Sequence, residues 1–272
     1  MITLLRAHRA LDAAARLPGV RTFLRREHDR RFESNTGANL FRGVFATFGE
    51  ALASAPANRP HGSDNESSAA LYVERSRRLY ATDYPVLFWL SRLGGDGPLR
   101  VFDLGGHVGV SYYAYRRHLA FPEGSRWVVH DVLAVMARGR VLADDRDPDR
   151  RLGFADAFGE AAESDVLLAQ GSLQYLPDTL GERLRALPRR PRHLLVNLTP
   201  LHETLAFFTL QSIGTAYCPY RVDSAPGFLA QLDAAGYDLL DQWENPDKKC
   251  TIPFHPGHSL DQYHGFCFRR RD

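Results

Sequence analysis

The sequence predicts an α/β protein built on a doubly wound, mostly parallel sheet. In the middle of the chain, short apolar runs with strand character alternate with stretches at helical spacing, the pattern of parallel strands joined by crossover helices. The first of these runs, 99–104, leads into a glycine-rich turn and a helix expected from about Ser111. Near the end, 237–244 and 263–269 look like two strands joined by a long loop, which predicts an antiparallel ending.

Each element follows from its own pattern of apolar residues. The predicted parallel strands are 99–104, 126–131, 152–155, 166–170 and 192–198. The predicted helices that connect and follow them are 111–119, 133–139, 180–187 and 228–235. Ligands of such sheets bind beyond the carboxyl ends of the strands, so the residues there are the first candidates for a site.

Residues 1–93 are expected to form an N-terminal helical arm and lid, and 94–272 the α/β domain. Helical spacing predicts helices at 4–15, 20–31, 71–80 and 86–93. Helices that precede the first strand often cover the ligand crevice. The first two helices fit a packing or homodimerising arm, or a basic amphipathic segment that rests on an acidic surface.

The composition is that of an ordinary globular protein. The chain has 272 residues and a formal net charge of +2, which does not suggest a nucleic-acid partner. Its three cysteines are widely spaced and form no metal-ligand pattern, so we expect no bound metal and a reducing, cytoplasmic location. No apolar run approaches the roughly 20 residues of a membrane span, and the N-terminus lacks the apolar core of a signal peptide.

The turn after the first predicted strand has the form Asp-x-Gly-x-x-x-Gly, from Asp103 to Gly109. A dinucleotide-binding turn carries Gly-x-Gly-x-x-Gly and no carboxylate at this place. Because Asp103 would repel a pyrophosphate, the turn favours a ligand with a positive charge or hydroxyl groups. S-adenosylmethionine has a sulfonium, an ammonium and a ribose, and it has no phosphate.

Further polar residues stand at the predicted strand ends. Asp131 is the last residue of the second predicted strand, 22 residues after Gly109, where a carboxylate can accept hydrogen bonds from both ribose hydroxyls. Dinucleotide enzymes use the same position, so Asp131 alone supports only nucleoside binding. Asp156 follows the third strand, and Gln170 ends the fourth.

Together these residues resemble the successive motifs of the class I S-adenosylmethionine-dependent methyltransferases, whose fold is a Rossmann-like, seven-stranded sheet. The resemblance extends to a bacterial methyltransferase group often encoded among polysaccharide or specialised-metabolite genes. The stretches that carry this second resemblance are 41–45, 84–87, 127–139, 171–176, 199–200 and Gln211. The chain departs from the common motif at His107, which replaces a glycine, and from the group at Asn197, which replaces an acidic residue.

The resemblance implies S-adenosylmethionine as the cofactor and assigns residues to each part of it. The assignments are Gly105, Gly106, His107 and Gly109 to the methionine turn, Asp103 to its support, Asp131 to the ribose, Asp156 and Ala157 to the adenine, and Gln170 and Gly171 to the region of the sulfonium.

The acceptor is expected to be a small molecule, methylated on oxygen by default and otherwise on nitrogen. His202, after the fifth strand, is the candidate general base, since histidine exchanges protons near neutral pH. The candidates for contact with the acceptor are Tyr84, Tyr175, Gln211, Tyr217, Tyr220 and His255. Two alternatives remain: a non-catalytic protein that binds S-adenosylmethionine, and a nicotinamide-dependent oxidoreductase, which Asp103 disfavours.

Overall fold

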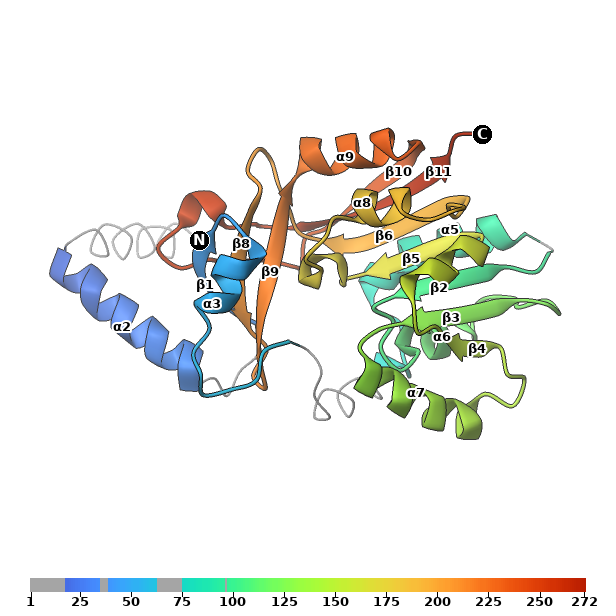
Figure 1. The fold of residues 1–272 in the computed structure, drawn as a ribbon, viewed down its shortest axis with the longest axis horizontal. Helices are drawn as coiled ribbons and strands as arrows, with labels where there is room; N and C mark the ends of the chain where they lie inside the picture. Colours follow the sequence, from blue (N-terminus) through green and yellow to red (C-terminus); the bar gives the residue numbers. More distant parts are fainter. Residues whose placement is uncertain (1–17, 35–38, 63–74, 96) are drawn as a thin grey trace, which may run out of the picture.

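The computed structural model describes residues 18–34, 39–62, 75–95 and 97–272. Within them the chain forms a seven-stranded sheet and a four-stranded sheet (Figure 1). The helix predicted at 4–15 and residues 71–74 of the helix predicted at 71–80 lie outside the described residues. Residues 76–80 are described and are not helical, so that part of the prediction is wrong: the chain turns there, and the N–H of Tyr80 donates to Asp83.

The large sheet confirms the predicted doubly wound architecture. Its strands are β2 (Arg100–Leu104), β3 (Arg126–His130), β4 (Leu152–Phe154), β5 (Val166–Gln170), β6 (His193–Thr199), β10 (Tyr237–Asn245) and β11 (Tyr263–Arg270). If these seven strands are numbered in chain order, their order across the sheet from β4 to β10 is 3-2-1-4-5-7-6. The pairs from β4 to β6 are parallel, and β11 is antiparallel to both β6 and β10. The antiparallel ending expected from the sequence is therefore confirmed.

The two faces of this sheet are covered by different helices, because successive strand side chains point to opposite faces. Val101 packs with α5 (Tyr84–Gly94) and α6 (Val110–Tyr115). Phe102 packs with the residues of α8 (Leu180–Arg185) and α9 (Ala225–Ala234). The central strands are thus buried on both sides, which accounts for their nearly continuous apolar sequences.

Helix α7 (Leu133–Arg146) continues well beyond Gly139, where the sequence predicted its end. A Cβ on Gly139 would lie 2.4 Å from the ring of Phe154. The glycine therefore allows the helix to approach strand β4 closely, and it does not mark a helix terminus. Three short 3-10 helices, at Phe158–Glu163, Leu173–Tyr175 and Pro256–His258, complete the connections after β4.

The sequence did not predict the second sheet. Its order is β1-β8-β9-β7, from β1 (Leu40–Phe45), β8 (Phe207–Ser212), β9 (Tyr217–Ser224) and β7 (Leu201–His202). Part of the expected helical lid is therefore a β-strand: Phe41 pairs with Gln211, and its ring packs on Tyr220 of β9. Before this strand, α2 (Pro18–Ser34) is helical as predicted, and after it α3 (Phe48–Ala53) forms a short helix.

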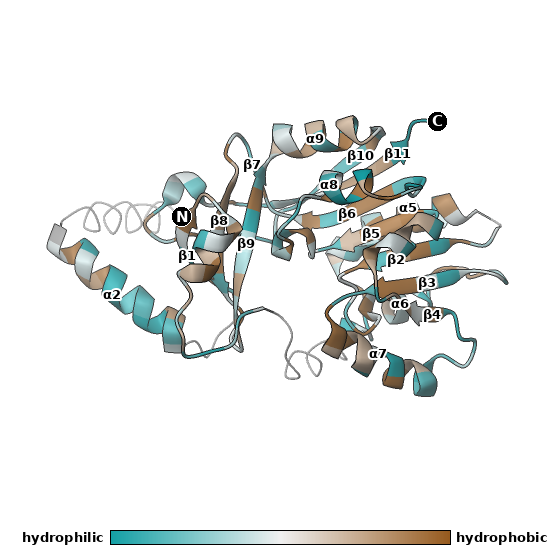
Figure 2. Ribbon diagram, viewed as in Figure 1, coloured by the Kyte–Doolittle hydropathy of each residue, from teal (hydrophilic) through white to brown (hydrophobic). Residues whose placement is uncertain are grey.

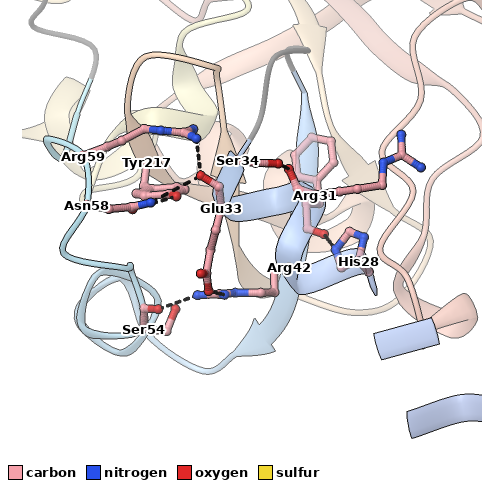
Figure 3. Close-up of polar contacts among 10 residues, drawn as sticks. His28, Arg31, Glu33, Ser34, Arg42, Ser54, Asn58, Arg59 and Tyr217 are labelled. Carbon is pink, nitrogen blue, oxygen red and sulfur yellow. Dashed lines mark hydrogen bonds and ion pairs between the residues drawn. The ribbon is translucent and has the colours of Figure 1, made fainter. Parts of the chain in front are cut away.

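Helix α2 is attached to the small sheet through polar contacts at its C-terminal end (Figure 3). The carbonyl of Glu33 accepts hydrogen bonds from Asn58 and Arg59, and its carboxylate pairs with Arg42. His28 lies 3.0 Å from the carbonyl of Phe41. Most of α2 is hydrophilic, whereas strand β3 is largely hydrophobic (Figure 2). This agrees with a helix that contacts the small sheet mainly through its C-terminal end, where Phe32 is buried.

The small sheet stands at the carboxyl edge of the large one. Strand β7 begins two residues after β6 ends, and the arrows of β5 and β6 point towards β9 (Figure 1). The carboxyl ends of the parallel strands, where this class of sheet binds ligands, therefore face the small sheet.

Candidate functional site

The glycine turn between β2 and α6 fits tightly against its surroundings. Gly105 has φ +76°, and a Cβ there would lie 2.3 Å from the Cβ of Ser172. Gly109 has φ +90°, and its Cβ would lie 2.7 Å from Leu152. Positive φ and close approach both require glycine. The sequence assigned these glycines to ligand contact. The structure shows in addition that Ser172 and Leu152 lie close against them.

Asp103 lies directly beneath this turn. A Cβ on Gly106 would be 2.4 Å from Asp103 Oδ2, and the indole N–H of Trp127 donates to the same oxygen at 3.0 Å. The side chain is buried, with 1% exposure. Burial raises the pKa of Asp103 to about 7; the Trp127 hydrogen bond opposes this effect, and the charge of Asp131 adds to it.

Asp131, just after β3, connects the end of that strand to the turn. Its Oδ2 accepts the backbone N–H of His107 at 2.9 Å, and its Oδ1 accepts the N–H of Val132 at 2.7 Å. His107 itself has φ +58°. Burial lowers the pKa of His107 to about 4, so its imidazole is neutral at pH 7. The turn therefore presents two acidic side chains and adds no cation of its own.

A buried polar network continues this site across the neighbouring strands. Asp83 Oδ1 accepts hydrogen bonds from Tyr115 at 2.8 Å and from Gln170 at 2.7 Å, while its Oδ2 accepts the N–H of Tyr80 at 2.7 Å. Tyr115 Oη also lies 2.9 Å from Gln170 Oε1. Asp83 lies directly before α5, and Tyr115 is the last residue of α6. Neither was predicted as a site residue.

Asn197 extends this network to strand β6. Its Nδ2 donates to the carbonyl of Thr82 at 2.8 Å, and its Oδ1 accepts hydrogen bonds from Trp243 and Asn245. Asp103, Gln170 and Asn197 therefore lie on the same face of three adjacent strands, β2, β5 and β6. These three side chains form a polar row at the carboxyl edge, called the polar floor below. Residues 80–83 lie over it and are held there by the hydrogen bonds from Gln170 to Asp83 and from Asn197 to Thr82.

Asp156 and Ala157, expected near the adenine, are exposed. Asp156 forms an ion pair with Arg140 of α7 at 2.6 Å. The backbone N–H of Ala157 donates to Glu160 Oε1 at 3.3 Å. Both residues thus lie at the expected strand end, and the Asp156 carboxylate already has a partner.

The geometry around His202 does not favour its predicted role as general base. Its Nδ1 accepts the backbone N–H groups of Thr204 at 3.1 Å and Leu205 at 3.0 Å. The proton of the neutral ring must therefore be on Nε2, which lies 2.9 Å from the carbonyl of Gly257. The lone pair that would take a proton from an acceptor is occupied. His202 instead ties the β7–β8 turn to the segment that precedes β11.

Three of the residues predicted to contact the acceptor lie together at the small sheet. Tyr175 donates to Gln211 Oε1 at 2.9 Å, and its ring packs edge-on against Tyr220 at 5.4 Å. Tyr220 in turn has its hydroxyl 2.7 Å from that of Tyr263. Tyr175 is the half-exposed member of the group, whereas Gln211 and Tyr220 are buried.

The other three are dispersed. Tyr84 is 61% exposed at the start of α5. Tyr217 has no exposed surface; it stacks on Phe32 at 5.3 Å and donates to Asn58. His255 lines a cavity of 330 Å³ between α2 and the 253–255 segment. Tyr217 thus belongs to the buried core of the small sheet.

Two further findings concern the described residues as a group. No three of their histidine, cysteine and acidic side chains come together in a way that could hold a metal ion. None of the helices that the structure describes has both the length and the apolar character needed to cross a bilayer.

No protein-family model and no curated protein sequence matches the chain. Solved structures do match it. The PH0226 protein of Pyrococcus horikoshii OT3 is 12% identical with a TM-score of 0.50, over 82% of this chain and 99% of that one. A Burkholderia thailandensis 1,6-didemethyltoxoflavin-N1-methyltransferase, solved with its substrate and S-adenosylhomocysteine, is 19% identical with a TM-score of 0.45, over 80% and 95%. An S-adenosylmethionine-dependent methyltransferase from Mesorhizobium loti is 15% identical with a TM-score of 0.47, over 70% and 98%.

Likeness at such low identity concerns the fold. The large sheet, with strand order 3-2-1-4-5-7-6 and an antiparallel β11, has the Rossmann-like fold of the class I methyltransferases. It differs from the dinucleotide-binding order 3-2-1-4-5-6 by the insertion of β11 between β6 and β10.

Proposed function

We propose that the protein is an S-adenosylmethionine-dependent methyltransferase that acts on a hydroxyl or amine of a small molecule. The observation that carries this proposal is the pair of carboxylates at the glycine turn. Asp103 lies beneath Gly106, and Asp131 is bonded to the backbone of His107. Asp103 disfavours a pyrophosphate at this turn, whereas a sulfonium would stabilise its charged form, and Asp131 suits the hydroxyls of a ribose.

The residues of the site fit the parts of S-adenosylmethionine. Asp131 is held in place by two backbone N–H groups, one on each oxygen, and a carboxylate offers about four acceptor sites in all, so this group suits the two hydroxyls of a ribose. The neutral His107 at the turn adds no charge that would repel a sulfonium. Gln170, held by Asp83, stands at the end of β5, next along the sheet from β2.

The chemistry requires mainly positioning. S-adenosylmethionine, when bound, supplies a methyl group on a positively charged sulfur. The fastened segment 80–83 and the polar floor would hold the reacting groups in line, and such positioning supplies a large part of the acceleration of a displacement. Tyr175 and Gln211 border the side of the small sheet from which an acceptor would approach. A hydroxyl acceptor must lose a proton and an amine need not; because His202 is engaged by backbone groups, we do not retain it as the base.

The test is calorimetric titration with S-adenosylhomocysteine. Asp131→Ala removes the proposed ribose acceptor, so binding should weaken by about 1.5–3 kcal/mol, the usual cost of a lost hydrogen bond to a charged group. Asp145→Ala is the matched control, because Asp145 lies on α7 with its side chain 84% exposed. Equal affinity of the wild type and Asp131→Ala would refute the assignment of Asp131 to the ribose.

A further inference from the structure

Asp83 is a buried carboxylate whose hydrogen-bond partners are all neutral. The residue is 6% exposed. Its Oδ1 accepts hydrogen bonds from the Tyr115 hydroxyl at 2.8 Å and from the Gln170 amide at 2.7 Å. Its Oδ2 accepts the backbone N–H of Tyr80 at 2.7 Å. Within the part of the chain that the structure describes, no salt bridge joins Asp83 to a basic side chain.

The negative charge of Asp83 is therefore incompletely balanced inside the protein. Hydrogen bonds from neutral donors offset part of the cost of taking a carboxylate out of water, and a nearby cation would offset more of it. The guanidinium groups of Arg75 and Arg78 lie 5.4 Å and 4.7 Å from the ring centre of Tyr80. Both arginines are exposed, so solvent and salt screen their charge. Such an incomplete arrangement is expected where a ligand supplies the missing positive charge.

The partly exposed surface beside Asp83 belongs to the candidate site. Gly105, Asp131 and Gln170 keep some exposure at the carboxyl edge, whereas Asp83, which contacts Gln170, is buried. These three residues follow or end β2, β3 and β5, which are neighbours in the sheet. The glycine turn also approaches the residues after β5, since a Cβ on Gly105 would lie 2.3 Å from the Cβ of Ser172. One edge therefore runs from Asp131 past the turn to Gln170.

The positive charge of S-adenosylmethionine is close to its ribose, because the sulfonium is bonded to the 5′-carbon of the sugar. If Asp131 holds the ribose, the sulfonium can lie on either side of it along the edge. On one side, β4 ends beside the cation of Arg140, which pairs with Asp156 at 2.6 Å and is an unfavourable neighbour for a second cation. On the other side, the end of β5 is two strand spacings away, or about 10 Å. The sulfonium is therefore favoured on the side of Gln170 and Asp83.

We propose that Asp83 is a specificity-determining residue, whose charge makes the site favour S-adenosylmethionine over the product S-adenosylhomocysteine. This inference rests on the proposed function and adds a property of the same site. When a lone pair of the acceptor takes the methyl group, the electron pair of the S–CH₃ bond stays on the sulfur, which becomes neutral, and the positive charge passes to the acceptor. A carboxylate near the sulfur attracts the cofactor and not the product. Methyl transfer therefore favours exchange of the product for new cofactor.

The test is calorimetric titration of each protein with S-adenosylmethionine and, separately, with S-adenosylhomocysteine. No acceptor is added, so no methyl transfer takes place. The measured quantity is the Kd for S-adenosylhomocysteine divided by the Kd for S-adenosylmethionine, called the affinity ratio below. Asp83→Asn removes the charge and keeps an oxygen for Tyr115 and Gln170. We expect the affinity ratio to fall at least about ten-fold in this variant, because the binding of S-adenosylmethionine weakens.

Two control variants separate the charge of Asp83 from its structural role. Tyr115→Phe removes a donor from the same carboxylate and leaves the charge, so it should affect both ligands alike and keep the affinity ratio. Asp241→Asn removes an exposed charge on β10 that accepts the indole N–H of Trp89 at 2.9 Å, and it should also keep the ratio. Because Asp83→Asn places an amide N–H opposite that of Tyr80, its folding is checked by urea unfolding. Asp83→Ser is the second variant without the charge and should show the same fall.

The outcomes separate this inference from the proposed function. If the wild type binds both ligands and neither Asp83→Asn nor Asp83→Ser lowers the affinity ratio, the role of Asp83 is refuted and the methyltransferase proposal stands. An equal fall in Tyr115→Phe or Asp241→Asn would also refute it, since the effect would then come from the geometry of the network or from overall charge. If the wild type binds neither ligand, the proposed function fails, and the role of Asp83 fails with it.

Discussion

Asp103 is predicted to reduce the stability of the protein at neutral pH. The carboxyl is buried beneath Gly106, with the Trp127 indole as a hydrogen-bond donor. Asn has nearly the same shape and keeps an oxygen for Trp127. Asp103→Asn therefore removes the buried charge with little change in packing, and we expect this variant to be more stable than the wild type at pH 8.

The magnitude follows from the difference between folded and unfolded states. The pKa of Asp103 is about 7 in the folded protein, against an ordinary value of 3.8. As the pH rises from about 4 to about 7, the unfolded chain has lost this proton and the folded protein still holds it. The free energy of unfolding of the wild type should therefore fall, by about 1.4 kcal/mol per pH unit and about 4 kcal/mol in all, relative to Asp103→Asn.

The assay is urea unfolding of both proteins from pH 4.5 to pH 8.5. The difference between the two free energies isolates Asp103, because groups such as His107 contribute to both proteins. Asp165→Asn serves as the control. Burial raises the pKa of Asp165, but the hydrogen bonds and charge of Arg100 outweigh this effect and lower it below 3.8. Its folded and unfolded pKa values both lie below the tested range, so its difference curve should be flat.

A flat curve for Asp103→Asn, or one that shows the wild type gaining stability towards pH 8, would refute this account. Either result would mean that the carboxylate is charged and well stabilised in the folded protein. In that case, Asp103 would not destabilise the fold, and no functional reason would be needed to explain why the residue is acidic. A confirmed loss of stability would fit a residue that is kept for function at a cost to the fold.

Two further predictions follow from the site geometry. Gly105→Ala should destabilise the protein by about 2 kcal/mol or more, because it combines a left-handed backbone with a Cβ placed 2.3 Å from Ser172. The control is Gly214→Ala, at a position with φ +89° and open space around it, which should show only the backbone cost of about 1 kcal/mol. Equal effects of the two substitutions in urea unfolding would count against the close contact at Gly105. His202→Ala should cost about 1–3 kcal/mol of stability through its lost backbone hydrogen bonds and leave S-adenosylhomocysteine affinity unchanged; unchanged stability with abolished turnover would restore His202 as the general base.

The sequence predicted the large sheet well, because each of its strands has a local pattern. Strand β5, at Val166–Gln170, has the predicted bounds, and β3 and β4 each end one residue early. Parallel strands buried on both faces have continuous apolar runs that stand out from their flanks.

The small sheet could not be found in the same way. Strand β1 pairs with β8, more than 160 residues further along the chain, and β7 has only two residues. An aromatic run such as 41–48 indicates burial and does not identify a distant partner. For the same reason, the predicted N-terminal lid contains a strand of a sheet that is completed by 207–224.

The candidate site shows the same difference: residues with a local sequence signal were predicted, and residues that meet only in three dimensions were not. Asp103, Asp131 and Gln170 were identified because strand ends and glycine turns are visible in the sequence. Asp83 and Tyr115 were missed, since their importance comes from meeting at Gln170 in three dimensions. His202 was predicted from its position after a strand, and only the structure shows that backbone groups occupy its ring nitrogens.

The most direct test of the central proposal is calorimetric titration of the purified protein with S-adenosylhomocysteine, with NAD and NADP titrated in parallel. Asp131 predicts saturable binding of S-adenosylhomocysteine through its ribose, and Asp103 beneath the glycine turn predicts no binding of either dinucleotide. Binding of NAD or NADP, with none of S-adenosylhomocysteine, would contradict the account and show that this turn accepts a pyrophosphate despite Asp103.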